Sequence, residues 1–197
     1  MRNYVTAIGL AATLSLPLAA QAQDVTPPPV PSNIVVPAGN HAYFVGHGVG
    51  TQNYVCAPAK SIGQVAWTLF TPQATLFGDA GQQLTTHFFS PNPDEGNSVI
   101  RATWEDSLDT SMVWAKANAT SSDPAFVNAN AVAWVLLEAV GTRVGPTGGA
   151  NLTRTTFIQR LNTFGGLAPA TGCDSPKDLG HKAFMPYTAD YFFFTKN

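Results

Sequence analysis

The stretch QVAWTLF at residues 64–70 alternates, so that Val65, Trp67 and Leu69 share one face of an extended chain. Strict alternation over this length predicts a β-strand with one buried face. Further short apolar or alternating runs lie at residues 34–36, 42–45, 52–57, 76–77, 84–89, 98–104, 111–115, 132–140, 155–161 and 186–194. We therefore expect an all-β, single-domain β-sandwich or barrel of about ten short strands, with long loops and one disulfide. Residues 132–140 are nearly all apolar, which suits a strand buried on both faces or a short helix.

Glycine, proline and acidic residues mark the expected connections. The segment GHGVG at residues 46–50 predicts a glycine turn between two short strands, and residues 78–81 and 91–97 predict further loops. Turn carboxylates usually cap local amides or face solvent. We expect this of Asp94 and Glu95 in the loop at residues 91–97, and of Glu105, Asp106 and Asp109 in an acidic turn at residues 105–109.

The composition is that of a turn-rich exported protein. Charged residues make up 11% of the 197 residues, against a usual share of about 25%. The chain holds 17 Gly and 15 Pro, and its net charge is −2. Because no stretch combines positive charge with aromatic residues, we expect no nucleic-acid partner.

The first 22 residues have the pattern of a signal peptide. Arg2 precedes an apolar run at residues 7–20, and Ala20-Gln21-Ala22 fits a cleavage site. The run is too short to span a membrane, so we expect a secreted or periplasmic protein that begins at Gln23. The sequence TPPPVP at residues 26–31 predicts an extended segment that is not core. We expect residues 23–36 to form a proline-rich leader and residues 37–197 to form the domain.

Cys56 and Cys173 are the only cysteines of the chain. In an oxidising compartment two cysteines usually pair, and this bridge would stabilise the fold by roughly 4–5 kcal/mol. The alternative is a thiolate that ligates a metal or acts as a nucleophile.

Three longer motifs carry a resemblance to a known family. They lie at residues 48–56, 157–166 and 186–191. Together they resemble the exported proteins of the domain of unknown function 3455 family. The resemblance implies a secreted, β-rich fold with the two cysteines bridged, and it implies no reaction and no catalytic residues. The chain has Asp109-Thr110-Ser111 where the family pattern has Asp-Gly-Ser, so this turn is expected to differ.

Some members of that family carry a dehydrogenase label, which these residues do not support. A dinucleotide fingerprint needs three glycines in the spacing G-x-G-x-x-G, followed by a helix. Counted from Gly46 and Gly48 the third position is Thr51, and counted from Gly48 and Gly50 it is Asn53. No helical pattern follows.

Histidines are the candidate metal ligands. His87 heads the sequence His-Phe-Phe at a predicted strand end, and His41 and His181 are possible partners after folding. The alternative is that His87 is a hydrogen-bonded structural residue. No cofactor is predicted otherwise, and a bound transition metal is the minority alternative.

Aromatic side chains are the candidate ligand contacts. Trp104 and Trp114 flank the acidic turn and are expected to be exposed, where they could stack on a sugar ring. Tyr54, Tyr187 and Asp190 are further candidates, and Asp190 is expected to bind backbone groups or Arg160.

These observations favour a non-catalytic envelope or extracellular binding module for a glycan or a small ligand. No G-x-S-x-G elbow or other recognisable catalytic motif occurs in the chain. The alternative function is a metal-dependent redox enzyme or hydrolase that uses His87 with a second histidine.

Overall fold

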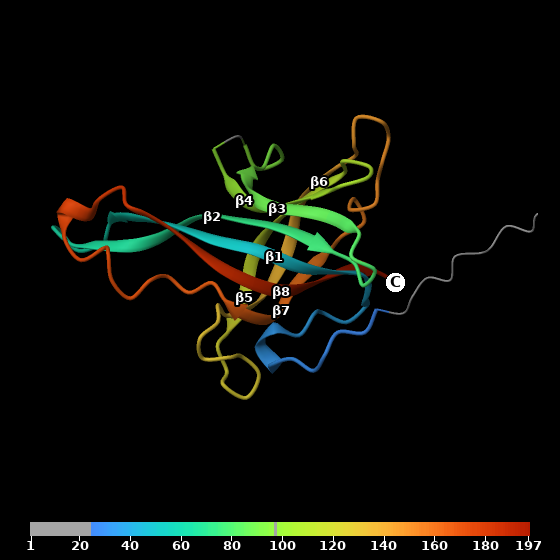
Figure 1. Cartoon of the computed structure of the whole chain (residues 1–197). Helices are drawn as coiled ribbons and strands as arrows, with labels where there is room; N and C mark the ends of the chain where they lie inside the picture. Colours follow the sequence, from blue (N-terminus) through green and yellow to red (C-terminus); the bar gives the residue numbers. More distant parts are fainter. Residues whose placement is uncertain (1–24, 97) are drawn as a thin grey trace, which may run out of the picture.

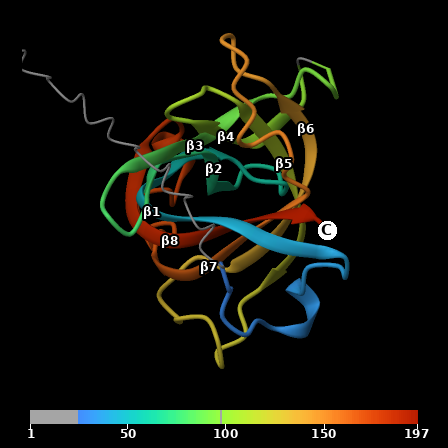
Figure 2. The same cartoon turned by 90° about the vertical axis from the view of Figure 1, so that its right-hand side faces the viewer.

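The computed structural model describes residues 25–96 and 98–197, which form a closed barrel of eight antiparallel strands (Figures 1 and 2). Each strand pairs with the next along the chain, and β8 closes on β1. The strands are β1 (Asn40–Pro58), β2 (Val65–Phe77), β3 (Gln83–Pro91), β4 (Ile100–Asp106), β5 (Met112–Ser121), β6 (Trp134–Arg143), β7 (Phe157–Gly165) and β8 (Lys182–Lys196). In these ranges no helix is long and apolar enough to cross a membrane. The all-β prediction is confirmed, but the strands number eight and the sandwich alternative is wrong.

The predicted glycine turn at residues 46–50 is wrong, because β1 runs through it without a break. A Cβ atom on Gly46 would lie 2.9 Å from Leu76, and one on Gly48 would lie 2.9 Å from the ring of Tyr191. The glycines therefore let large side chains of other strands approach the backbone of β1. They are required by packing, and not by a turn.

The connections are otherwise close to prediction. Residues 78–81 join β2 to β3 with a backbone bond from Gly81 to Gly78. Asp106 caps the turn after β4, accepting hydrogen bonds from the N–H groups of Leu108 and Asp109 at 2.8 and 2.9 Å. In the same turn Thr110 has φ +57°, in the left-handed region that favours glycine.

Large side chains fill much of the barrel interior. Trp104, Tyr191 and Phe193 are fully or almost fully buried, and Trp104 makes edge contacts with both of the others at centroid distances of 5.7 and 5.9 Å. The core cluster also includes Ala74, Leu76, Val113, Ala115, Val135, Leu137, Leu152, Ile158, Tyr187 and Ala189. Burial of these aromatic rings supplies much of the hydrophobic stabilisation.

A second cluster lies on the outer face of the barrel and is covered by residues 25–36, here called the N-terminal strap. The strap contains η1 (Ser32–Ile34), and Ile34 is fully buried against Leu136, Leu161 and Phe192. Gln159 donates a hydrogen bond of 2.7 Å to the carbonyl of Ile34. Residues 34–36 therefore do not form the expected edge strand, and Ile34 packs in this outer cluster. The predicted signal peptide and Gln23 lie outside the described residues.

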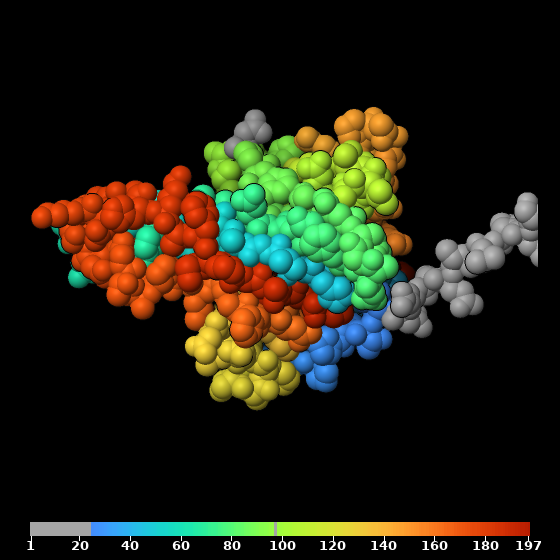
Figure 3. Space-filling view, in the orientation of Figure 1, coloured from blue at the N-terminus to red at the C-terminus, as the bar shows by residue number. Residues whose placement is uncertain are grey.

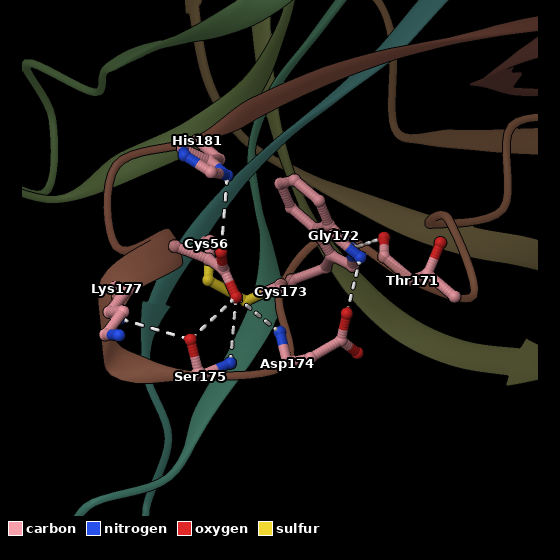
Figure 4. A network of polar contacts seen from close by, with 10 residues as sticks. Cys56, Thr171, Gly172, Cys173, Asp174, Ser175, Lys177 and His181 are labelled. Atoms are coloured by element: carbon pink, nitrogen blue, oxygen red, sulfur yellow. Dashed lines mark hydrogen bonds and ion pairs between the residues drawn. A yellow bond between two sulfur atoms is a disulfide. The ribbon is translucent and has the colours of Figure 1, made fainter.

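β1, β2 and β8 extend together beyond the barrel as an arm (Figures 1 and 3). The predicted disulfide between Cys56 and Cys173 is confirmed, and it ties β1 to the loop that precedes β8. In this loop η2 (Pro176–Asp178) begins with a capping box between Ser175 and Asp178 (Figure 4). Backbone bonds from Cys56 to His181 and from Gly180 to Cys56 hold the same loop on the arm.

Candidate functional site

The candidate site is a cavity of about 490 Å³ inside the barrel. All eight strands contribute to its wall. The lining residues are Gln52, Leu69, Pro72, His87, Phe89, Ile100, Arg101, Ala102, Trp104, Ala115, Lys116, Ala117, Val135, Leu137, Arg160 and Tyr191. Ile100 is 50% exposed, and Lys116 and Ala117 are exposed as well, so these residues form the mouth.

Small inward-facing side chains make room for the cavity. Strand pairing places Ala102 opposite Ala115, and Ala117 opposite Leu137. On the same face, two residues further along each strand, Trp104 lies opposite Val113. Because paired residues point to the same face of a sheet, the step from large to small residues leaves one end of the barrel unfilled.

His87 lies on the cavity wall as a neutral, structurally bonded side chain. Its ring stacks on Trp104, with centroids 4.1 Å apart and planes 8° from parallel. The carbonyl of Thr103 lies 2.9 Å from Nδ1, and because a carbonyl only accepts, Nδ1 carries the proton of the neutral ring. Burial lowers the pKa of His87 to about 3. The geometry fits the alternative that His87 is a hydrogen-bonded structural residue.

Arg160 places a positive charge on the inner wall. β7 pairs it with Tyr191 on one side and Val135 on the other, both of which line the cavity. Its Nη2 donates to the carbonyl of Ala133 at 2.9 Å, whereas its buried Nε has no partner. No carboxylate within the described part of the chain forms an ion pair with Arg160.

Three further polar side chains lie close to this arginine along the wall or behind it. The hydroxyls of Tyr187 and Tyr191 hydrogen-bond each other at 3.0 Å, and burial raises the pKa of both. Gln52 is buried, and its side-chain amide interacts with the Tyr187 hydroxyl. The inner wall is thus apolar with a small set of hydrogen-bonding groups.

The cations at the mouth differ from Arg160 because both are paired. Glu95 accepts two hydrogen bonds of 2.7 Å from Arg101, and Lys116 lies 3.3 Å from Glu138. The hydrogen bonds from Arg101 and then from Asn92 lower the pKa of Glu95 to about 2. Glu95 is therefore ionised at neutral pH and keeps Arg101 in place beside the mouth.

A family model described as "Protein of unknown function (DUF3455)" matches residues 37–195. The chain belongs to this family. No curated protein and no solved structure matches the chain. The resemblance seen in the three motifs is therefore confirmed.

The predicted aromatic platform does not form on this DUF3455 protein. Trp104 and Trp114 are 0% and 3% exposed, so the prediction that they face solvent is wrong. Trp104 lines the cavity, whereas Trp114 donates a hydrogen bond of 2.8 Å to Ser90. Tyr187 belongs to the core, and the Tyr54 hydroxyl donates to the carbonyl of Gly166 beside the arm. Burying these rings stabilises the barrel, which leaves only Trp104 of the set at the candidate site.

Asp190 lies outside the barrel, with partners other than those expected. Its carboxylate lies 2.7 Å from Nδ1 of His47 and accepts a 2.7 Å hydrogen bond from Asn162. The second ring nitrogen of His47 lies 2.9 Å from Asp79, and hydrogen bonds to Asp190 and then Asp79 raise the pKa of His47. The predicted contact of Asp190 with Arg160 is wrong. Arg160 pairs with Tyr191, and Asp190, the neighbour of Tyr191 in β8, points to the opposite face of the sheet.

The structure does not bring the three predicted metal ligands together. His41 lies 2.8 Å from the side-chain oxygen of Asn197, and His181 lies 3.8 Å from Asp178. Neither lines the cavity beside His87. No group of three His, Cys, Asp or Glu side chains in residues 25–96 and 98–197 could hold a metal ion.

The sequence-based reasoning missed Arg160 and Gln52 as site residues. A signal for Arg160 was present, because alternation in residues 155–161 places it on the same face as Ile158. An arginine among apolar residues of one strand face points to a paired or functional charge. Gln52 carries no such signal. With a turn expected at residues 46–50, the sequence did not indicate which face of the sheet the Gln52 side chain occupies.

Proposed function

We propose that this protein is an exported binding protein that holds a small, mainly apolar ligand inside its barrel. The observation that carries the proposal is the cavity of about 490 Å³ with a wall from all eight strands and an open mouth. Ligand sites of proteins typically measure about 300–1,000 Å³, with apolar walls and a few polar groups. The signal-peptide pattern and the disulfide support export, since disulfides persist in oxidising compartments.

The wall favours a small ligand over a glycan. Sugar rings stack on exposed aromatic faces, but Trp104 on β4, Trp114 on β5 and Trp134 on β6 are buried. The wall is instead built from Leu, Ile, Val, Ala and Phe side chains with Trp104 at its base. A compact apolar molecule matches such a surface.

The wall also favours binding over catalysis. Its described residues include no carboxylate, serine, threonine or cysteine that could act as a nucleophile or a general base. His87 and Tyr191 are the inner wall residues that could transfer a proton, but burial lowers the pKa of His87 to about 3 and raises the pKa of Tyr191, so neither is an effective base at neutral pH.

The test is a titration of the purified, exported protein with N-phenyl-1-naphthylamine, a neutral apolar dye that fluoresces when it leaves water. We expect saturable binding of one dye per chain. Ala117→Trp adds a large ring at the exposed mouth, and we expect it to weaken dye binding at least about tenfold, because overlap excludes the ligand. Ala66→Trp adds the same ring at an exposed position of β2 away from the cavity and is the matched control.

Saturable binding that is lost in Ala117→Trp and kept in Ala66→Trp would support the proposed function. Absence of saturable binding to the unmodified protein would refute it. Equal affinities for the dye in all three proteins would also refute it, because the dye would then bind elsewhere.

A further inference from the structure

Arg160 identifies the chemistry of the ligand, on the basis of the proposed function. Arginine stays protonated in proteins, so its charge cannot be removed by a pKa shift. A charge inside an apolar wall is unfavourable unless an opposite charge or several acceptors surround it. Within the described residues Arg160 donates to the carbonyl of Ala133 and interacts with the Tyr191 hydroxyl, but it has no carboxylate partner.

The other polar side chains of the wall give Arg160 no opposite charge, because none of them is a carboxylate. The indole nitrogen of Trp104 is buried without a hydrogen-bond partner, and this residue also lines the cavity. Such groups occur rarely in folded proteins, because an unmade hydrogen bond in the interior costs about 1–3 kcal/mol. The cavity therefore offers donors, and no carboxylate, to a ligand that presents acceptor atoms.

The charge balance indicates that the ligand carries a single negative charge. Three cations line the cavity, but Arg101 is held by Glu95 and Lys116 lies beside Glu138. Neutral His87 adds no positive charge. One unpaired guanidinium therefore faces a wall that is otherwise apolar, and guanidinium binds a carboxylate through two parallel hydrogen bonds.

We infer that the ligand is an apolar monocarboxylate whose carboxylate pairs with Arg160 and whose body fills the apolar half of the cavity. The mouth at Ile100 and Ala117 admits it, and the carboxylate lies inside while the apolar body extends toward the mouth. A dianionic phosphate would need a second unpaired cation, which the wall does not supply.

The test compares decanoate with decanamide, which has the same chain length and a neutral head group, by isothermal titration calorimetry. We expect decanoate to bind about tenfold to a hundredfold more tightly, since a hydrogen bond to a charged group contributes that much. Arg160→Met keeps the length of the side chain and removes the charge. We expect this variant to lose the preference for decanoate while its affinity for decanamide changes less than about threefold.

Arg143→Met is the matched control, because it makes the same substitution at an exposed arginine that does not line the cavity. We expect this control to keep the preference for decanoate. Equal binding of decanoate and decanamide to the unmodified protein would overturn the inference, and needs no variant to fold. If the dye binds as proposed while this preference is absent, the proposed function stands and the carboxylate inference fails. If the unmodified protein binds neither the dye nor decanoate, both fail.

Discussion

Removal of the disulfide in the double variant Cys56→Ala, Cys173→Ala is expected to destabilise the protein by roughly 5 kcal/mol. The bridge spans 117 positions of sequence. For a loop of that size the chain-entropy relation gives about 16 cal/mol/K, which is about 4.9 kcal/mol at 25 °C. In the folded state of the variant, residue 56 should keep its backbone hydrogen bonds to residues 180 and 181. The loss should therefore arise mainly from the greater freedom of the unfolded chain.

Urea denaturation followed by tryptophan fluorescence measures this loss. With a slope of about 2–3 kcal/mol/M, the midpoint of the double variant should fall by about 2 M. A reducing agent is the control: it should move the midpoint of the unmodified protein to that of the variant, and leave the variant unchanged. A loss below about 1 kcal/mol would refute the reasoning, because the loop would then be constrained without the bridge.

Four further changes test separate features. Thr110→Gly should stabilise the protein by about 0.5–1 kcal/mol in urea denaturation, because Thr110 adopts φ +57°. Destabilisation would show that the 2.7 Å hydrogen bond from the Thr110 hydroxyl to the carbonyl of Asp109 matters more than the backbone conformation. Gly48→Ala should destabilise by about 1–3 kcal/mol, since the new Cβ would lie 2.9 Å from Tyr191; an unchanged midpoint would contradict the packing explanation. His87 has a folded-state pKa of about 3 against 6.5 for a free ring, so it disfavours the folded state as pH falls below 6.5, by roughly 1.4 kcal/mol per pH unit. His87→Asn should reduce this loss of stability between pH 6.5 and 4.5. An identical pH profile of stability in the variant would exclude His87 as the source of the loss. The raised pKa of His47 has the opposite sign, because its contribution is complete below pH 6.5 and is lost as pH rises through the higher folded-state value. His47→Asn should therefore cost more stability at pH 5.5 than at pH 8.5, and equal costs at both pH values would argue against the ion pairs.

Local patterns predicted the strands that alternate and the turns that follow them. Residues 64–70 lie in β2 as expected, and the connection at residues 78–81 joins β2 to β3. These features depend on neighbours in sequence, so the sequence carries them directly. The disulfide was predicted from the oxidising compartment, and the family resemblance also implied it.

The features that were missed depend on partners far along the chain. Gly48 lies within a strand because Ala189 and Leu76 flank it, and neither is visible in the local sequence around it. Trp104 is buried because closure of the barrel surrounds it with Tyr191 and Phe193. The cavity needs all eight strands in register before Arg160 lies on its wall, so no single motif could indicate it.

The closing pair of the barrel also sets an order for folding. β1 can pair with β2 as soon as both are available, but its other side stays unpaired until β8, the last strand of the barrel, is in place. Contacts between such distant segments form slowly, because a long loop must close first. Until then the partly folded chain exposes two long strand edges to other molecules. A chain shortened within β8 would keep those edges permanently, and we expect it to associate with further copies rather than fold alone.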